Sequence, residues 1–277
     1  MNKNRPLVSV LIGTYNRAKL LPRCLNSILQ QTHKNLEIIV VDDHSQDETP
    51  VVLKKYQQKY PQKIRYLVNQ KNRGISFNSN KAFQLAKGDY LALCGDDDQW
   101  FNKHKLNKQL AIFKKNPQIG LVGTWWYEIK NKKIWRHHQP VLPKNLKAKI
   151  LRGNGLIGGS TALVSRQAWE QVNGFDSQMP KGTDSDLFRR IIFANFQVGI
   201  VPEYCVKMYV GGHPRMTSVN SFKSLKKSFS AHLRTIIKFN IWFLRYPQAL
   251  FRRLIILLGQ TYQVLISYGQ NPTKARN

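Results

Sequence analysis

The first 100 residues alternate short apolar runs with segments of helical periodicity. Apolar, β-branched runs occupy residues 7–13, 36–41, 64–68 and 90–94, and the segments between them, 19–31, 49–60 and 76–86, predict helices. This order is typical of a parallel sheet whose crossover connections are helical, so we predict an α/β fold. Further along the chain, the pattern predicts helices at 104–114 and 166–172 and strands at 119–129 and 160–165.

Acidic side chains are scarce, and two groups of them follow strands of the predicted sheet. Asp42 and Asp43 come after the strand at 36–41, and Asp96, Asp97 and Asp98 come after the strand at 90–94. In open α/β sheets, ligands bind at the carboxyl ends of the strands. We therefore expect both groups at one ligand-binding edge.

The overall charge is strongly positive, since 44 Lys and Arg residues outnumber 15 Asp and Glu residues and give a net charge of +29. Such a balance predicts an anionic partner: nucleic acid, an acidic membrane surface or a phosphorylated substrate. A nucleic-acid-binding protein is one alternative, but acids at two strand ends would repel phosphate, and we expect no nucleic-acid partner. A non-catalytic relative and a nucleotidyltransferase are others, although the segment at 13–17 has one glycine where a phosphate loop has several.

Three adjacent carboxylates at 96–98 repel one another unless a cation compensates them. Oxygen ligands at a strand end suit Mg²⁺ or Mn²⁺, which would bridge carboxylates and substrate phosphates. The alternative is a solvated acidic turn. Asp42 and Asp43 are placed to accept hydrogen bonds from a nucleobase N–H or from ribose hydroxyls, whereas Asp47 or Ser45 is expected to cap the helix that follows.

Several short motifs occur in an order that resembles the family 2 glycosyltransferases of the GT-A fold. The resemblance covers residues 6–217 and rests on VSV at 8–10, TYNR at 14–17, VVDDHS at 40–45, NRG at 72–74, AKGDY at 86–90, DDDQW at 96–100, GS at 159–160, GFD at 174–176 and DSDL at 184–187. It implies a Rossmann-like sheet and transfer of a sugar, with inversion, from a nucleotide-diphosphate sugar, preferably a UDP-sugar, to an acceptor hydroxyl. A Q-x-x-R-W element is absent from the sequence, which favours addition of single sugars.

The resemblance also implies roles for individual residues of the donor site. Asp43 would bind the donor base with Asp42 beside it, and Asp96 and Asp98 would be the two ends of the family's D-x-D element, Asp98 being the direct ligand of Mn²⁺ or Mg²⁺. The residues expected to contact the nucleotide sugar are Thr14, Tyr15, Arg17, Asp42, Asp43, Arg73, Asn80, Asp96 and Asp97.

A single displacement needs a base that takes the acceptor proton. The resemblance places Asp184 in this role, with Asp186 as the second candidate; the alternative for Asp184 is the N-cap of a helix that begins near residue 187. His213 lies where such enzymes carry a late histidine, so it is expected to complete the metal site.

The last part of the chain has a different character, because residues 204–277 contain no acid. We expect a GT-A domain at 1–219, with a nucleotide-binding half at about 1–100 and an acceptor half at about 101–219, and a basic amphipathic helical region at 220–277. Residues 221–268 combine Lys and Arg with Trp, Phe, Leu and Ile, a mixture suited to an anionic membrane surface. The alternative is a helical hairpin packed on the catalytic domain.

These features together predict a cytoplasmic enzyme that is peripheral on the inner face of the membrane. Its expected acceptor is a glycan or lipid-linked glycan of cell-surface polysaccharide, lipopolysaccharide or capsule. The longest apolar stretch, at 254–268, is too short to span a bilayer.

Overall fold

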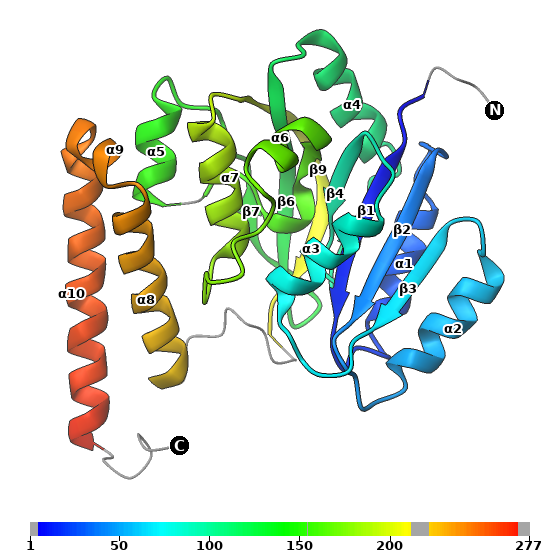
Figure 1. Ribbon diagram of the computed structural model, residues 1–277, viewed down its shortest axis with the longest axis horizontal. Helices are drawn as coiled ribbons and strands as arrows, with labels where there is room; N and C mark the ends of the chain where they lie inside the picture. Colours follow the sequence, from blue (N-terminus) through cyan, green and yellow to red (C-terminus); the bar gives the residue numbers. More distant parts are fainter. Residues whose placement is uncertain (1–4, 154, 212–221, 271–277) are drawn as a thin grey trace.

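The computed structural model describes residues 5–153, 155–211 and 222–270, and within them a single sheet of nine strands runs through the molecule (Figure 1). The strand order is β3-β2-β1-β4-β8-β6-β9-β5, and β7 pairs with β6 beside this path. The strands are β1 (Val8–Thr14), β2 (Leu36–Asp42), β3 (Ile64–Val68), β4 (Tyr90–Leu93), β5 (Gln99–Trp100), β6 (Ile119–Lys130), β7 (Lys133–His138), β8 (Leu163–Ser165) and β9 (Gln197–Tyr209).

Most of the central strands run in one direction. β1, β2, β3 and β4 are mutually parallel, and β8 is antiparallel to both β4 and β6, so β6 and its parallel partner β9 point the same way as β4. The carboxyl ends of β1, β2 and β4 therefore meet at one edge, where the acidic groups were expected. The predicted α/β fold is confirmed.

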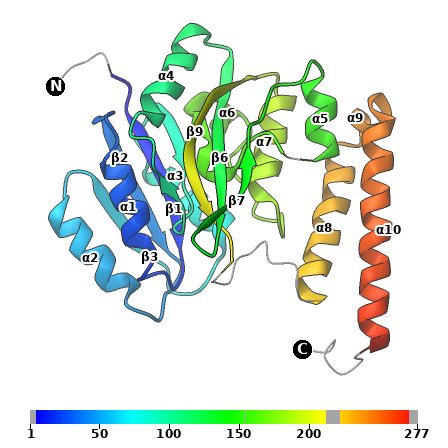
Figure 2. The ribbon, with the colours of Figure 1, turned by 180° about the vertical axis from the view of Figure 1, so that it is seen from behind.

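Helices cover both faces of the sheet and bury a hydrophobic cluster on each side. The first cluster packs α1, α2 and α4 on the sheet, and the second packs α3, α5, α6 and α7 on the opposite face (Figures 1 and 2). The helices are α1 (Leu21–Leu29), α2 (Thr49–Lys59), α3 (Ile75–Leu85), α4 (Lys105–Lys115), α5 (Leu146–Arg152), α6 (Arg166–Gln171) and α7 (Thr183–Phe193), with a 3₁₀ turn η1 (Gly159–Thr161).

The predicted strand at 160–165 is wrong in its first half. Ser160 and Thr161 belong to the 3₁₀ turn η1, and only the last residues form β8. The amide of Thr161 bonds the carbonyl of Gly158 across this turn, which gives it helical rather than extended geometry. The turn places the Ser160 hydroxyl beside the second acidic group.

Residues 222–270, the last part of the chain that the structure describes, form three helices: α8 (Phe222–Lys238), α9 (Asn240–Arg245) and α10 (Pro247–Gln270). α8 and α10 lie side by side at the edge of the molecule remote from β3 (Figures 1 and 2). Pro247 is the first residue of α10, a position that needs no N–H partner. A small cluster of Leu151, Phe239, Phe243 and Ala249 joins α9 and α10 to α5. Of the helices that the structure describes, none has the length and apolarity needed to cross a bilayer.

Candidate active site

Asp43 organises the loop between β3 and α3. Its carboxylate accepts hydrogen bonds from the Arg73 amide (2.7 Å), the Gly74 amide (2.8 Å) and the Asn69 side-chain amide (2.9 Å). Gly74 has φ of 84°, a backbone conformation that favours glycine. The Asp43 amide in turn donates to the carbonyl of Thr14 at the end of β1, so Asp43 joins three loops at the carboxyl edge.

Asp42, the last residue of β2, is buried and has one oxygen without a partner. Its Oδ1 accepts from the Ser45 amide (3.2 Å) and hydroxyl (2.5 Å), whereas Oδ2 is buried with no hydrogen bond. Burial raises the pKa of this carboxyl, and the Ser45 hydrogen bonds offset the increase in part. An unsatisfied buried acceptor fits a ligand N–H or O–H donor. The expectation that Asp47 or Ser45 is the N-cap of α2 is wrong, because the N-cap residue is Glu48 and its side chain makes no capping hydrogen bond. The Asp47 carboxylate still accepts from the Thr49 amide (2.9 Å) in the first turn, whereas the Ser45 hydroxyl bonds Asp42.

The second acidic group lies in the turn between β4 and β5. Burial raises the pKa of Asp96 to about 7 with the help of the Asp97 charge, and Thr14, Arg17 and the Tyr15 amide lower it in part. We call residues 95–98 the acidic turn. The Arg17 Nε lies 3.7 Å from Asp96 Oδ1, so the loop at 14–17 after β1 reaches the acidic turn.

Asp97 and Asp98 are also buried, and their carboxylates pack closely against Gly95. A Cβ on Gly95 would be 3.0 Å from both Asp97 Oδ1 and Asp98 Oδ2, so any larger residue would crowd the two carboxylates. Asp98 Oδ2 accepts from the Ser160 hydroxyl (2.5 Å), and Oδ1 accepts from the Tyr209 amide (3.2 Å). Asp98 is thereby fixed to η1 and to the end of β9.

These donors fit a divalent cation of the Mg²⁺ or Mn²⁺ class. Such ions are bound by one or two carboxylates together with substrate phosphates. Asp96 and Asp98 supply two hard oxygen ligands in one turn, where burial and the neighbouring Asp97 charge raise the pKa of Asp96. Within residues 5–153, 155–211 and 222–270, no group of three His, Cys, Asp or Glu side chains forms a complete metal cage. His213, the expected third ligand, lies outside the described residues.

Asp184 is the second residue of α7, next to the turn that holds Asp98. The helix begins at Thr183 with Gly182 as its N-cap, so the alternative of Asp184 as the cap of a helix that begins near residue 187 is wrong. Its Oδ1 accepts from the Ser185 amide (2.7 Å), and its Oδ2 lies 3.2 Å from the position of a Cβ on Gly159. Gly159 precedes Ser160, the residue that bonds Asp98, so a single turn separates the two acids. Burial raises the pKa of Asp184, which makes its carboxylate a stronger base.

Asp186 has a different environment, because cations occupy both of its oxygens. Oδ2 accepts from Arg190 Nε (2.8 Å) and Oδ1 from Lys238 Nζ (2.9 Å), and Lys238 also pairs with Asp176 (2.6 Å). Asp186 thus joins α7 to α8. Of the two predicted bases, Asp184 contacts Gly159 in the turn that bonds Asp98, whereas the carboxylate of Asp186 is bound by Arg190 and Lys238.

The remaining predicted donor-site residues are spread along the same edge. Tyr15 is exposed, and the Arg73 guanidinium lies 4.5 Å from the centre of the Phe77 ring. Asn80 is tied to the backbone of Phe175, donating to its carbonyl (2.8 Å) and accepting from its amide (2.9 Å). Its side-chain amide therefore holds the segment before α7, and its role in nucleotide binding stays a prediction.

Sequence reasoning missed two supports of the acidic turn, Arg23 and Tyr209. The Arg23 guanidinium donates to the Asp97 carbonyl (2.5 Å) and lies 3.5 Å from the centre of the Tyr209 ring. Tyr209 also bonds Asp98 through its amide and Gln99 through its hydroxyl (2.9 Å). Neither residue belongs to a short motif, because Arg23 reaches the turn from α1, 74 positions before Asp97, and Tyr209 reaches it from β9, 111 positions after Asp98.

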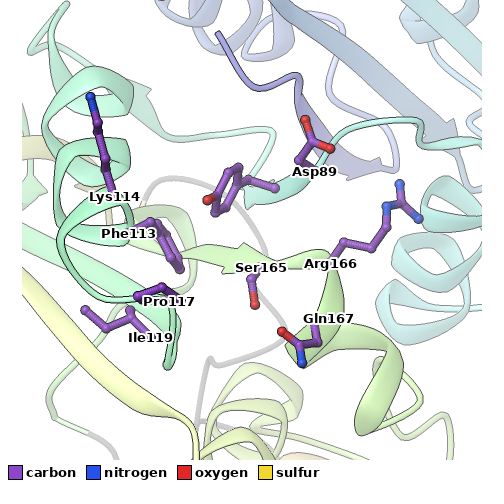
Figure 3. Close-up of a pocket in the computed structure, with 9 residues that line it drawn as sticks. Asp89, Phe113, Lys114, Pro117, Ile119, Ser165, Arg166 and Gln167 are labelled. Carbon is purple, nitrogen blue, oxygen red and sulfur yellow. The ribbon is translucent and has the colours of Figure 1, made fainter. Parts of the chain in front are cut away.

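A separate pocket of about 340 Å³ lies at the opposite edge of the sheet (Figure 3). It is bordered by Asp89 and Tyr90 at the start of β4 and by Ile119 at the start of β6. Since the acidic groups follow the carboxyl ends of the strands, this pocket is not part of the site described above.

Comparison with known proteins agrees with this geometry. The sequence pattern described as Glycosyl transferase family 2 matches residues 9–172. An uncharacterized glycosyltransferase of Methanocaldococcus jannaschii is 30% identical over 209 residues, which are 74% of this chain and 71% of that protein. A chondroitin synthase of Escherichia coli is 28% identical over 194 residues, 68% of this chain but 27% of that longer protein.

Solved structures share the fold at lower identity. The mannosyltransferase PcManGT of Pyrobaculum calidifontis, in complex with GDP-Man and Mn²⁺, has a TM-score of 0.67 at 19% identity, covering 98% of this chain and 82% of that one. TarS of S. aureus, in complex with UDP-GlcNAc, has a TM-score of 0.65 at 18% identity, covering 82% and 66%. The expected GT-A fold is confirmed, and the chain belongs to glycosyl transferase family 2 and is a glycosyltransferase.

Proposed function

We propose that this glycosyltransferase moves one sugar from a nucleotide-diphosphate sugar, preferably a UDP-sugar, to an acceptor hydroxyl with inversion at the anomeric carbon. The acceptor is a glycan or lipid-linked glycan of a cell-surface polysaccharide, lipopolysaccharide or capsule. One observation carries the proposal: the turn Gly159–Thr161 contacts the candidate base Asp184 with its first residue and the candidate metal ligand Asp98 with its second.

The donor nucleotide binds at the carboxyl edge of β1, β2 and β4. Asp42 supports this placement, because its unpartnered Oδ2 needs a donor that a nucleobase or ribose would supply. Asp43 fixes the loop at 69–74 that would border the base, and Arg17 would approach the diphosphate from the loop after β1. Arg17 is suited to phosphate because guanidinium groups bind phosphate oxygens in pairs.

Asp96 and Asp98 would hold Mn²⁺ or Mg²⁺ on the donor diphosphate, with His213 as a further ligand. When bound, this cation supplies positive charge against the leaving diphosphate. The Ser160 hydroxyl and the Tyr209 amide keep the Asp98 carboxylate in one orientation. Arg23 holds the main chain of the same turn through the Asp97 carbonyl.

Asp184 acts as the base of a single displacement. The acceptor oxygen forms a bond to the anomeric carbon while the bond from that carbon to the diphosphate oxygen breaks, and the acceptor proton passes to Asp184. The nucleoside diphosphate leaves with the electron pair of the broken bond. Burial supports this role, because it raises the pKa of Asp184 above that of an exposed carboxyl group.

We further propose that α8, α9 and α10 attach the enzyme to the inner face of the cytoplasmic membrane. These helices expose Ile237, Ile241, Leu244, Phe251 and Leu258, and they carry the exposed cations Lys226, Lys227, Arg245 and Arg252. Apolar side chains flanked by cations favour an interface of anionic lipid.

A screen of nucleotide sugars tests the donor proposal. Purified protein is incubated with UDP-, GDP- and other nucleotide sugars in the presence of Mn²⁺, and release of the nucleoside diphosphate is measured. Binding of the correct nucleotide with Mn²⁺ is expected to raise the melting temperature, because the ligand stabilises the folded state. Failure of every nucleoside diphosphate to raise it would contradict the donor site.

A further inference from the structure

A second surface of the sheet carries a group of aromatic rings that the active site does not use. We call Phe101, Trp125, Tyr127, His137 and Tyr204 the aromatic face. Tyr127 pairs with His137 on β7 and with Lys207 on β9, and Trp125 pairs with Tyr204, so these side chains project from one side of neighbouring strands.

The rings form one connected array. Tyr127 and Tyr204 are stacked with centroids 3.9 Å apart and planes 10° apart, and Phe101 stacks on Tyr127 at 5.9 Å. His137 bonds the Tyr204 hydroxyl (3.1 Å) and stands edge-on to Tyr127. Phe101 is 38% exposed, and His137 is exposed as well. The array is therefore a connected aromatic cluster in which Phe101 and His137 are exposed and Trp125, Tyr127 and Tyr204 are half-buried.

The aromatic face lies on the back of the strands that support the acidic turn. Met208 and Trp126 alternate with Lys207 and Tyr127, and they contact Gly158, beside the turn that bonds Asp98. Helix α4 packs on β6 and β9, where its Ile112 meets Gly199 and its Lys108 pairs with Glu203. In Figure 2 the lower parts of β6, β7 and β9 face the viewer with no helix in front of them.

One cation lies against the aromatic face, and two more lie at the end of the neighbouring β6–β7 hairpin. Lys207 Nζ lies 5.2 Å from the centre of the Phe101 ring, and at the end of the hairpin Lys130 and Arg136 lie 5.1 and 4.0 Å from that of Trp135, which is 47% exposed. The two acids on these strands are already engaged, since Glu203 pairs with Lys108 and Glu128 lies 3.3 Å from His138. Positive charge therefore lies beside the aromatic face at Lys207 and at the neighbouring end of the hairpin.

This combination is complementary to a sugar chain that bears negative groups. A pyranose ring has an apolar side of C–H groups that packs on an aromatic ring, and carboxylate, phosphate or sulfate substituents pair with Lys and Arg. Exposed apolar surface rimmed by polar residues generally marks a binding site. Two copies of this chain would bring like charges together here, which disfavours a second copy as the occupant.

We propose that the aromatic face is a binding site for an anionic glycan chain, distinct from the active site and behind it. The inference deepens the proposed function and rests on it for the identity of the chain, the acceptor polysaccharide. Sugars remote from the reacting hydroxyl would be held there, which would keep the acceptor on the enzyme between encounters with the site.

Binding is measured by calorimetry on the full chain without donor or metal. The probes are an acidic hexasaccharide of alternating uronic acid and N-acetylhexosamine and a neutral hexasaccharide of N-acetylglucosamine. We expect the acidic probe to bind more tightly, and Phe101→Ala and Tyr204→Ala to raise its Kd roughly tenfold each. Lys207→Ala is expected to weaken the acidic probe and to leave the neutral one unchanged. Tyr262→Ala, which removes a ring 66% exposed on α10, is the matched control and should change neither Kd.

Release of nucleoside diphosphate from the donor, measured on the same variants, separates this inference from the proposed function. Normal release with no binding of either hexasaccharide overturns the inference alone. A second outcome is that no nucleotide sugar releases its nucleoside diphosphate, but the acidic hexasaccharide binds and Phe101→Ala weakens this binding. That outcome overturns the proposed function and supports glycan binding at the aromatic face. Tighter binding of single-stranded RNA than of the acidic hexasaccharide, or a dimer in sedimentation that Phe101→Ala dissociates, would assign the face to another occupant and overturn the inference.

Discussion

The hydroxyl of Ser160 donates a 2.5 Å hydrogen bond to Oδ2 of Asp98, although 61 residues separate the two in the sequence. The same hydroxyl accepts from the Gly95 amide (2.8 Å), so one side chain closes the acidic turn at both ends. The indole N–H of Trp100 donates to the Ser160 carbonyl (2.9 Å) and so fixes the backbone of the 3₁₀ turn η1. Because Gly159 contacts Asp184, the orientation of a metal ligand and the position of the base depend on one short turn.

Replacing Ser160 by alanine should therefore reduce activity without unfolding the protein. Groups that orient a metal ligand commonly contribute ten- to a hundredfold to metal affinity or activity, and we expect Ser160→Ala to lose activity by about this factor. The apparent affinity for Mn²⁺ should fall in parallel, measured by metal titration of donor hydrolysis. Ser165→Ala is the matched control, because Ser165 caps α6: it should lower the free energy of unfolding by about 1 kcal/mol and leave activity intact.

Asp184→Asn tests the base. An amide cannot accept the proton of the acceptor, so transfer should fall by about a thousandfold, whereas donor affinity should stay within a factor of about two. Rates are measured with acceptor present, and donor affinity by calorimetry with the nucleoside diphosphate. Substantial turnover in this variant would remove Asp184 from the mechanism.

Asp186→Asn is expected to act on stability rather than on chemistry. It removes the charge that holds Arg190 and Lys238, leaving two cations near the α7–α8 junction without their common partner. We expect the free energy of unfolding to fall by about 2 kcal/mol, measured by urea denaturation. Lys238→Met, which removes the exposed partner, should cost less. A folded Asp186→Asn variant that loses turnover as fully as Asp184→Asn would contradict this assignment.

The pKa of Asp96 predicts an unusual pH dependence of stability. Since the pKa is raised from 3.8 to about 7 in the folded state, that state binds the proton more tightly than the unfolded chain does. The contribution of Asp96 to stability is therefore present at low pH and is lost as pH rises toward 7. Burial lowers the pKa of His232 to about 4, so the contribution of His232 to stability increases between about pH 4 and 6.5, opposite to that of Asp96. The effect of Asp96 is therefore isolated by comparing the parent protein with an Asp96 variant.

Melting temperatures from pH 5 to pH 8 in the presence of a chelator measure this effect. The difference between Asp96→Asn and the parent protein should grow in favour of the variant as pH rises, because the variant has no charge to bury. Adding Mn²⁺ at pH 8 should stabilise the parent protein and have a smaller effect on Asp96→Asn. A difference that stays constant across this pH range would show that Asp96 does not titrate as described.

The sequence predicts the first half of the fold better than the second, for physical reasons. β1, β2 and β4 are buried on both faces, so they appear as continuous apolar runs, and the predicted ends lie within two residues of those observed. β7 is exposed along most of its length and reads KIWRHH, and β9 contains Pro202 and Glu203 within its course. Neither segment has the apolar run or the strict alternation that identifies a strand.

The same contrast applies to the site. Asp42, Asp43 and Asp96–Asp98 are visible in the sequence because they directly follow apolar strands. The different environments of Asp184 and Asp186 could not be predicted from the sequence. Asp186 is paired with Lys238 of α8, and this helix lies beside α7 only in the folded chain. Tyr209 reaches Asp98 through pairing of β9 with β5, a two-residue strand.

Membrane attachment is tested by charge placed on the exposed apolar side chains of α9. Ile241 and Leu244 are 73% and 81% exposed, so Ile241→Glu and Leu244→Glu should leave the fold intact while repelling anionic lipid. We expect the parent protein to float with vesicles containing phosphatidylglycerol, to do so less at high salt, and to remain unbound with phosphatidylcholine alone. Val51→Glu, on α2 and 61% exposed, carries the same change outside these helices and should still float. Equal flotation of all three variants would show that α9 does not contact the lipid.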